Sequence, residues 1–200
     1  INSHFLYNVP DSIKMMAEVR GIYNVSDALL ALARMFRYNL QIDSHSVTLQ
    51  EEIAYLENYL KLCNIRYDYY INLSENVEDP AGKLKVPKVI LQPIAENSIA
   101  HGLDELAEDT TIYLKVYRKG DCAYIEMTDM GKGMDEDKLR KVREMIQNGG
   151  GGDNSTNGIG LHNIHERIRL MYGEEYGVEI FSMENCYTKV VLTIHAEVTA

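Results

Sequence analysis

The amino-terminal segment H-F-L-Y-N and the pair Glu96-Asn97 carry side chains that could take part in group transfer. A neutral imidazole such as that of His4 is a competent nucleophile, and Asn8 lies one helical turn further along the same face. The amide oxygen of Asn97 could ligate Mg²⁺, and the carboxylate of Glu96 could act as a general base or orient water. Taken singly, each feature also fits an ordinary surface His or a polar helix end before Gly102.

Two glycine-containing segments add features that suit a nucleotide. Asp129 directly follows a predicted strand, where its carboxylate could accept a hydrogen bond from the amine of adenine. Gly131 and Gly133 permit sharp turns and a close approach of the backbone to a flat ring. Gly158 and Gly160 open a predicted helix, whose free N–H groups and dipole favour phosphate. Alone, a D-x-G-x-G segment is also compatible with a simple turn.

Composition limits the classes of protein that could use these side chains. The chain has 200 residues, 46% of them hydrophobic, and a formal net charge of -10. This charge argues against a nonspecific nucleic-acid binder, which needs a basic face. The cysteines lie far apart without metal-site spacing, so we expect free thiols in a reducing, cytoplasmic compartment. Because the chain starts at Ile1 within a patterned segment, we also expect it to be a fragment of a longer protein.

The first third of the chain is predicted to be helical. Apolar residues recur at heptad-like spacing from Leu49 to Cys63, after Thr48 as N-cap and Glu51 as its capping-box partner. Residues 28–40 repeat this spacing, and a short polar link at 43–47 fits antiparallel neighbours. The pattern predicts a two-helix hairpin with an exposed apolar stripe, which pairs with a second copy into a four-helix bundle.

The remaining residues alternate between strand and helix patterns. Strands are predicted at 69–73, 111–117, 123–127, 178–183 and 188–195, and helices at 87–100, 136–148 and 160–171. Residues 75–82 and the glycine-rich 149–157 are predicted loops. The predicted fold class is α+β, with a helix layer on a mixed, mostly antiparallel sheet.

In this order, the segments resemble the sensor histidine kinases of bacterial two-component systems, in particular the LytS/YesM-like subfamily. The phosphoacceptor box lies at 4–8, the N box at 92–102, the G1 box at 129–134 and the G2 box at 158–163, and residues 166–173 continue the likeness. The chain departs from the family pattern at four positions: Ser3, Pro10, Ala100 and Met130.

The resemblance implies that ATP phosphorylates His4, which then passes the phosphoryl group to an aspartate of a response regulator. Glu96 would be a candidate catalytic base, and Asn97 would ligate Mg²⁺. The resemblance further implies a Bergerat-type ATP-binding sandwich at 69–200 with a lid at about 134–157, after a dimerising phosphoacceptor region at 1–68. The expected nucleotide-binding residues are Asn97, His101, Asp129, Gly131, Gly133, Met134, Gly158, Gly160 and Leu161.

The same resemblance implies a homodimer formed through the helical hairpin, and a response regulator as partner, with no nucleic acid. The chain would be the cytoplasmic portion of a bacterial sensor that is anchored in the membrane by segments outside it.

Two alternatives stay open at the level of sequence. The first is an ATPase of the same superfamily, in which Glu96 activates water. The second is a nucleotide-gated dimerisation module that has lost catalysis, because Ala100 replaces the usual lysine of the N box and Pro10 interrupts the first helix.

Overall fold

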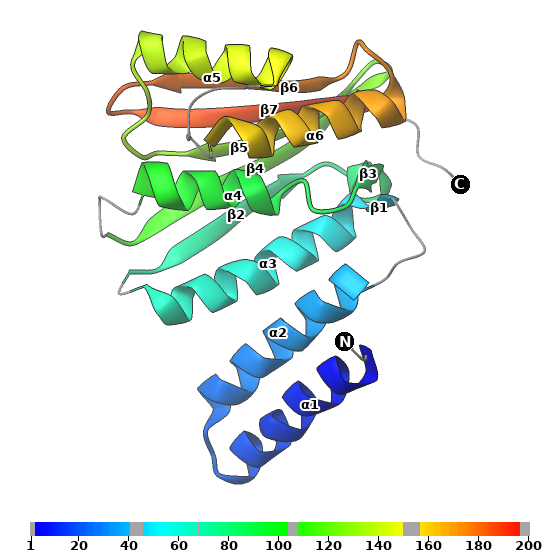
Figure 1. Ribbon diagram of the computed structural model, residues 1–200, viewed down its shortest axis with the longest axis vertical. Helices are drawn as coiled ribbons and strands as arrows, with labels where there is room; N and C mark the ends of the chain where they lie inside the picture. The colour runs from blue at the N-terminus through cyan, green and yellow to red at the C-terminus, as the bar shows by residue number, and fades with distance from the viewer. Residues whose placement is uncertain (1–2, 41–45, 68, 104–107, 150–156, 197–200) are drawn as a thin grey trace.

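The computed structural model describes residues 3–40, 46–67, 69–103, 108–149 and 157–196 (Figure 1). Within these residues the expected α+β fold is confirmed, with a layer of helices packed on a sheet. No helix in the described part of the chain is both long and apolar enough to cross a membrane.

The sheet has five strands among the described residues, in the order β2-β4-β5-β7-β6. β2 and β4 are parallel and the other neighbours are antiparallel, which confirms the mixed, mostly antiparallel sheet. Buried and partly buried side chains alternate along β5, as expected for a sheet with one covered face. The bounds are Ile71–Val77 for β2, Thr110–Lys119 for β4, Cys122–Asp129 for β5, Gly177–Met183 for β6 and Tyr187–His195 for β7.

Helices cover one face of this sheet (Figure 1). They are α3 (Leu49–Arg66), α4 (Gln92–Asn97), α5 (Glu136–Asn148) and α6 (Asn157–Tyr172), and α4 continues into the π-helix η2 (Ser98–Leu103). The opposite face is partly polar: Tyr117 and Tyr124 stack there with ring centroids 5.2 Å apart, and Tyr117 donates a hydrogen bond to Glu126. One face of the sheet therefore forms the core with the helices, and the other carries polar side chains.

Helix α3 begins as the sequence predicts. Thr48 is its N-cap, and Thr48 and Glu51 form both hydrogen bonds of the capping box. However, Leu49, Leu56 and the other residues of the heptad-like seam are buried in the same core as the sheet. The prediction that this seam forms an exposed stripe of a hairpin is therefore wrong, because the sheet covers it.

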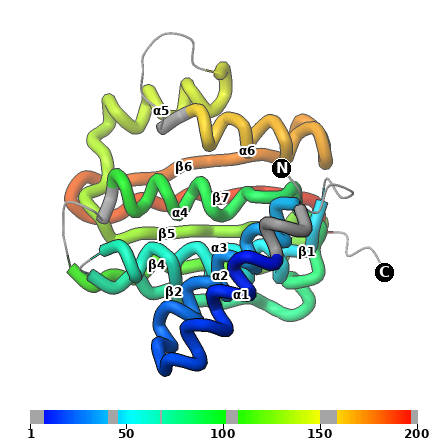
Figure 2. The backbone as a smooth tube through the Cα atoms, turned by 60° about the horizontal axis from the view of Figure 1, so that its bottom comes forward, coloured from blue at the N-terminus to red at the C-terminus, as the bar shows by residue number. Residues whose placement is uncertain are grey.

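The projecting hairpin consists instead of α1 (Ser3–Val19) and α2 (Tyr23–Leu40), joined at Gly21, whose φ is 71°. The hairpin is the blue pair of helices in Figures 1 and 2, and in Figure 1 α3 lies between it and the rest of the helix layer. α1 continues through Pro10, and Arg37 pairs with Asp11 across the hairpin at 3.1 Å.

Two further predictions need correction, and a third falls outside the described residues. The helix predicted to start at residue 87 starts at Gln92, because residues 85–87 form the short strand β3 (Lys85–Pro87), which pairs with β1 (Ser46–Thr48). β2 extends to Val77, into the predicted loop, and a short 3-10 helix η1 (Ala81–Lys83) follows. Residues 150–156 of the predicted glycine-rich loop lie outside the described residues.

Candidate nucleotide-binding site

A cavity with about 530 Å³ of empty volume lies between the helix layer and the sheet. α4, η2, α5 and α6 contribute to its walls, and β5, β6 and β7 form its floor. The lining residues are Ile94, Asn97, Ser98, His101, Asp129, Gly133, Met134, Lys138, Val142, Leu161, Ile180, Thr188 and Val190.

Asp129 places a carboxylate in a wall that is otherwise mostly apolar. It ends β5 and is only 1% exposed. Burial raises the pKa of this carboxyl, while hydrogen bonds from Ser98 and from the backbone N–H groups of Gly131 and Thr188 act in the opposite direction. The Gly131 N–H lies 3.1 Å from Oδ1. These donors fix the orientation of an acceptor that a ligand amine could reach.

Gly133 is required by the backbone around the cavity. Its φ is 60°, and a Cβ at this position would lie 1.9 Å from the backbone oxygen of Met183. Any side chain would therefore force apart the loop after β5 and the β6–β7 hairpin. The close approach at Gly133 is thus to the backbone of the β6–β7 turn, and an approach to a flat ring stays a prediction.

Asn97 and Glu96 face different surroundings although they are adjacent. Asn97, at the end of α4, lines the cavity. Neighbouring residues on a helix point about 100° apart. Glu96 is exposed and accepts a hydrogen bond from Gln92 at 2.7 Å. Glu96 is not among the residues that line the cavity. Burial raises the pKa of Tyr59 on α3, and the negative charge of Glu96 adds to this effect.

The donor set near Asn97 fits Mg²⁺ bound through a substrate rather than in a protein cage. Among the described residues, no three or more His, Cys, Asp or Glu side chains gather where they could hold a metal ion. Mg²⁺ usually keeps several waters and takes one or two protein oxygens together with substrate phosphates. The single amide oxygen that Asn97 brings to the cavity suits this coordination.

Gly158, Gly160 and Leu161 lie at the start of α6, and Leu161 lines the cavity. A Cβ at Gly160 would lie 3.8 Å from Pro93 of α4, so the two helices are close at this point. Leu161 is 2% exposed and lines the cavity. The free N–H groups of this helix start are available to an anion.

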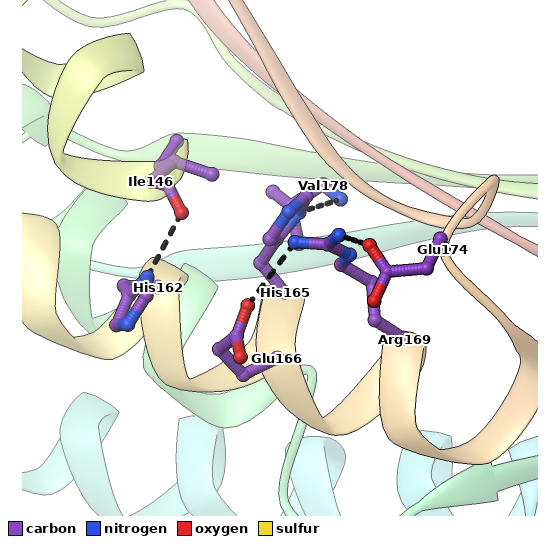
Figure 3. Close-up of polar contacts among 7 residues, drawn as sticks. All are labelled: Ile146, His162, His165, Glu166, Arg169, Glu174 and Val178. Carbon is purple, nitrogen blue, oxygen red and sulfur yellow. Dashed lines mark hydrogen bonds and ion pairs between the residues drawn. The ribbon is translucent and has the colours of Figure 1, made fainter. Parts of the chain in front are cut away.

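Further along α6, polar side chains tie the helix to its neighbours (Figure 3). His162 Nδ1 donates to the backbone oxygen of Ile146 on α5 at 2.9 Å. His165 Nδ1 accepts from the Val178 N–H on β6 at 3.0 Å, and Arg169 pairs with Glu166 and Glu174. His162 and His165 are therefore structural, and α6 is held between α5 and the sheet.

The structure brings some of the sequence-predicted residues together and separates others. Asn97, His101, Asp129, Gly133, Met134 and Leu161 all line one cavity, and Gly131 lies beside it through its bond to Asp129. His4 lies on a different element, in the first turn of α1. α5 occupies much of the predicted lid, and its residues Lys138 and Val142 also line the cavity.

Sequence reasoning missed several residues of the wall. Ser98 follows Asn97 directly, so its place in the N box was a usable signal. Thr188 lies opposite Asp129 in the β5–β7 register, which depends on long-range pairing and leaves no local signal. The apolar members Ile94, Ile180 and Val190 look like ordinary core residues in the sequence.

Two family profiles match the chain. Residues 1–71 match the histidine kinase family, and residues 86–198 match the family described as histidine kinase-, DNA gyrase B-, and HSP90-like ATPase. The first match ends at the start of β2 and the second begins within β3, shortly before the helix that carries Asn97.

Curated relatives and solved structures agree with these profiles. The chain is 31% identical over 194 residues to the sensor histidine kinase YesM of Bacillus subtilis, covering 97% of this chain and 32% of YesM. It is 32% identical over 191 residues to the sensor protein kinase HptS of Staphylococcus aureus, covering 96% of this chain and 36% of HptS. The chain thus spans about a third of the length of the curated relatives it matches.

Among solved structures, the histidine kinase domain of the blue-light activated histidine kinase EL346 from Erythrobacter litoralis matches with a TM-score of 0.51 and 12% identity, over 92% of this chain and 84% of that one. The catalytic domain of the histidine kinase ThkA matches with a TM-score of 0.53 and 14% identity, over 75% of this chain and 93% of that one. At these identities the two structures support the fold alone.

Proposed function

Because this chain belongs to the histidine kinase-, DNA gyrase B- and HSP90-like ATPase family, and its first 71 residues match the histidine kinases, we propose that it is the core of a protein histidine autokinase. In this proposal ATP is the phosphoryl donor and His4 is the acceptor. The phosphoryl group then passes to an aspartate of a response regulator.

One observation carries the proposal: the buried Asp129 carboxylate in an otherwise mostly apolar cavity. In the proposed complex, Asp129 accepts a hydrogen bond from the exocyclic amine of adenine. Ile94 and Leu161 pack against the faces of the ring, and Gly133 lets the loop after β5 lie directly against the β6–β7 turn at the cavity. Burial makes this contact selective, because a ligand without the amine covers the carboxylate and leaves part of its capacity to accept hydrogen bonds unfilled.

The phosphates would extend toward the start of α6 and the end of α4. The N–H groups of residues 158–161 would bind phosphate oxygens, and His101 lies in the wall nearby. Asn97 would hold Mg²⁺, which neutralises charge on the phosphates when it is bound. Protein groups in this part of the site therefore position the phosphates and stabilise charge.

The transfer itself would join the two regions of the chain. A ring nitrogen of His4 forms a bond to the γ-phosphorus while the bond to the ADP oxygen breaks, and ADP leaves. Because His4 lies on the hairpin, the hairpin must approach the cavity for this step. Glu96, on the exposed side of α4, stays a candidate for the base that activates His4.

The proposed partners follow from the region at residues 1–68. Ile13, Met16 and Val19 of α1 are exposed apolar side chains, which suit a helical bundle with a second copy of the chain. We therefore propose a homodimer through the hairpin and a response regulator as the acceptor. We also propose a bacterial sensor whose membrane-anchoring segments lie outside this chain.

The test is incubation with γ-labelled ATP and Mg²⁺, followed by acid and base treatment of the protein. The proposal predicts label that is lost in acid and stable in base, and that is absent from His4→Ala and Asn97→Asp. Asn76→Asp, an exposed residue on β2, is the matched control and keeps the label. Label of the same stability in His4→Ala would contradict the assignment of the acceptor.

The same experiment separates the alternatives. Steady release of inorganic phosphate that Glu96→Ala abolishes, without any phosphoprotein, would indicate an ATPase. The position of Glu96 outside the cavity wall disfavours that function. Nucleotide-dependent dimerisation without label or phosphate release would indicate a module that has lost catalysis.

A further inference from the structure

A turn at residues 88–91 holds a buried carboxylate from a distant helix. Val89, Ile90 and Leu91 donate their backbone N–H groups to the carboxylate of Glu52, at N–O distances of 2.6, 2.8 and 3.2 Å. Glu52 is 0% exposed and lies on α3, directly after the capping-box residue Glu51. Consecutive N–H groups that converge on one anion form the arrangement known as a nest.

The backbone of Val89 shows that this turn needs support. Its φ is 55°, in the left-handed region that β-branched residues rarely adopt. This conformation directs the three N–H groups toward one side of the chain, where Glu52 accepts all of them. The buried carboxylate therefore stabilises a shape that the sequence of the turn does not favour by itself.

The turn leads directly into the helix that bears Asn97. Leu91 is the N-cap of α4, so its hydrogen bond to Glu52 fixes the start of that helix. α4 is only six residues long, and both Ile94 and Asn97 line the cavity. A shift of the 88–91 turn would therefore also move Ile94 and Asn97, because both lie within two helical turns of it.

The hairpin is bound to the same carboxylate. The hydroxyl of Tyr38, near the end of α2, donates a hydrogen bond to Glu52 Oε1. The Tyr38 ring stacks on the ring of Tyr55 of α3, with centroids 4.4 Å apart. Lys88 Nζ donates a hydrogen bond to the backbone oxygen of Tyr38 at 3.1 Å. Burial, followed by the charge of Glu52, strongly raises the pKa of the Tyr38 hydroxyl, which therefore stays a donor.

A third helix contacts this turn. Arg167 of α6 donates to the backbone oxygen of Lys88, and Tyr172 of α6 donates to the backbone oxygen of Lys85. α6 also supplies Leu161 to the cavity. The segment 85–91 therefore contacts three parts of the chain. These are the end of the hairpin, helix α4 with Asn97, and helix α6 with Gly158 and Gly160.

We propose that Glu52 is a positioning residue that fixes the 88–91 turn, and with it α4 at the nucleotide cavity, while Tyr38 uses the same carboxylate to fix the hairpin relative to α4. The proposal rests on the proposed autokinase function, because it assigns the acceptor to the hairpin and the nucleotide to the cavity. Glu52 then determines nucleotide affinity, and Tyr38 determines the rate of transfer.

The first variant is Tyr38→Phe in the whole chain of 200 residues. It removes one hydrogen bond to a charged group, so we expect kcat for autophosphorylation to fall about tenfold while KM for ATP stays within about twofold. Tyr23→Phe, 68% exposed on the same helix, is the matched control and leaves both values unchanged. An unchanged kcat in Tyr38→Phe, or equal changes in kcat and KM, would overturn the role of Tyr38.

The second variant is Glu52→Gln, which replaces one acceptor oxygen with an NH₂ donor facing the backbone N–H groups. We expect ATP to bind about tenfold more weakly and amide hydrogen exchange of residues 89–97 to become faster. Glu57→Gln, exposed on the same helix, is the control and changes neither. Unchanged exchange and unchanged affinity in Glu52→Gln would refute its positioning role.

These readouts separate the two proposals. ATP binding and hydrogen exchange need no phosphoryl transfer, so a wild-type chain without label contradicts the autokinase and leaves the role of Glu52 measurable. If Glu52→Gln does not fold, hydrogen exchange of Tyr38→Phe decides: faster exchange at residues 88–91 at an unchanged Tm supports the contact, and unchanged exchange overturns it.

Discussion

Helix α3 and the α1–α2 hairpin carry apolar stripes with similar spacing, but the stripe of α3 is buried and that of the hairpin is exposed. Leu56 and Leu60 on α3 are 0% and 3% exposed, whereas Ile13 and Met16 on α1 are 44% and 56% exposed. The described residues of the main core start at Val47, and α2 adds only the half-buried Tyr38 to its margin. Periodicity therefore predicts that a stripe will be covered, but it does not predict which partner covers it.

This difference divides the chemistry between the two regions. The sheet region has a complete core and a cavity with a buried carboxylate, so it can bind a ligand as a single copy. The described part of the hairpin has few buried side chains and carries the His4 segment, and in the proposed homodimer a second copy covers its stripe. Four predictions follow, in order of decreasing effect.

The largest expected effect is on the stability of the sheet region. Leu56→Ala removes a fully buried side chain, so the free energy of unfolding should fall by about 2–5 kcal/mol. Met16→Ala on the exposed face of α1 should change it by less than about 0.5 kcal/mol. Urea denaturation followed by circular dichroism measures both, and equal effects of the two variants would remove the contrast between the stripes.

The next effect is on nucleotide affinity. Asp129→Asn keeps the shape of the side chain and removes its charge, so the affinity for ATP should fall about 10- to 100-fold. Self-association should stay the same, because the hairpin is untouched. Calorimetric titration with ATP and Mg²⁺ measures the affinity. Asp137→Asn, an exposed residue on α5, is the control, and equal affinities of the two variants would exclude Asp129 from the site.

A smaller effect depends on pH. Burial lowers the pKa of His165. The charge of Arg169 also lowers it, and that of Glu166 raises it. The His165 imidazole therefore takes up a proton more readily in the unfolded chain than in the folded chain. Stability from neutral His165 is present above its unfolded pKa of about 6.5 and is lost as pH falls below that value, at no more than about 1.4 kcal/mol per pH unit.

His165→Gln removes this titration. The dependence of the free energy of unfolding on pH between 7.5 and 5 should therefore be shallower in the variant than in the wild type. Urea denaturation at each pH gives the comparison. Parallel curves would mean that His165 does not contribute to acid sensitivity of the sheet region.

The smallest effect on the folded chain is expected at the hairpin. Ile13→Ser changes a side chain that is 44% exposed, so the stability of the single copy should change by less than about 0.5 kcal/mol. Self-association should nevertheless weaken, because the stripe is covered only by a second copy. Sedimentation equilibrium tests this, and an unchanged dimer would mean that another surface forms the interface.

Local signals explain how much of the fold could be predicted. Thr48 and Glu51 specify the start of α3, and the alternating residues around Gly120 specify the β4–β5 hairpin, so both were predicted from the sequence. The pairing of β1 with β3 was missed, because it joins two strands of three residues that lie far apart in the chain. Strands this short leave too few residues for a periodic pattern.

The same reasoning applies to the site. Asn97 and Asp129 were predicted because motif order placed them, whereas Thr188 depends on strand register. Glu52 looks like any other helical glutamate beside Glu51. Its partners are backbone N–H groups at residues 89–91. Because nearly every residue has a backbone N–H group, the sequence does not indicate which of them a side chain binds. Long-range contacts to backbone are therefore where a structure adds most.

The most direct test of this division of labour is to map the phosphate after reaction with ATP and Mg²⁺ at neutral pH. Trypsin releases residues 1–14 as one peptide, and His4 is its one histidine. The account predicts that mass spectrometry finds acid-labile phosphate in this peptide, at His4. Phosphate confined to peptides from residues 15–200 would contradict it.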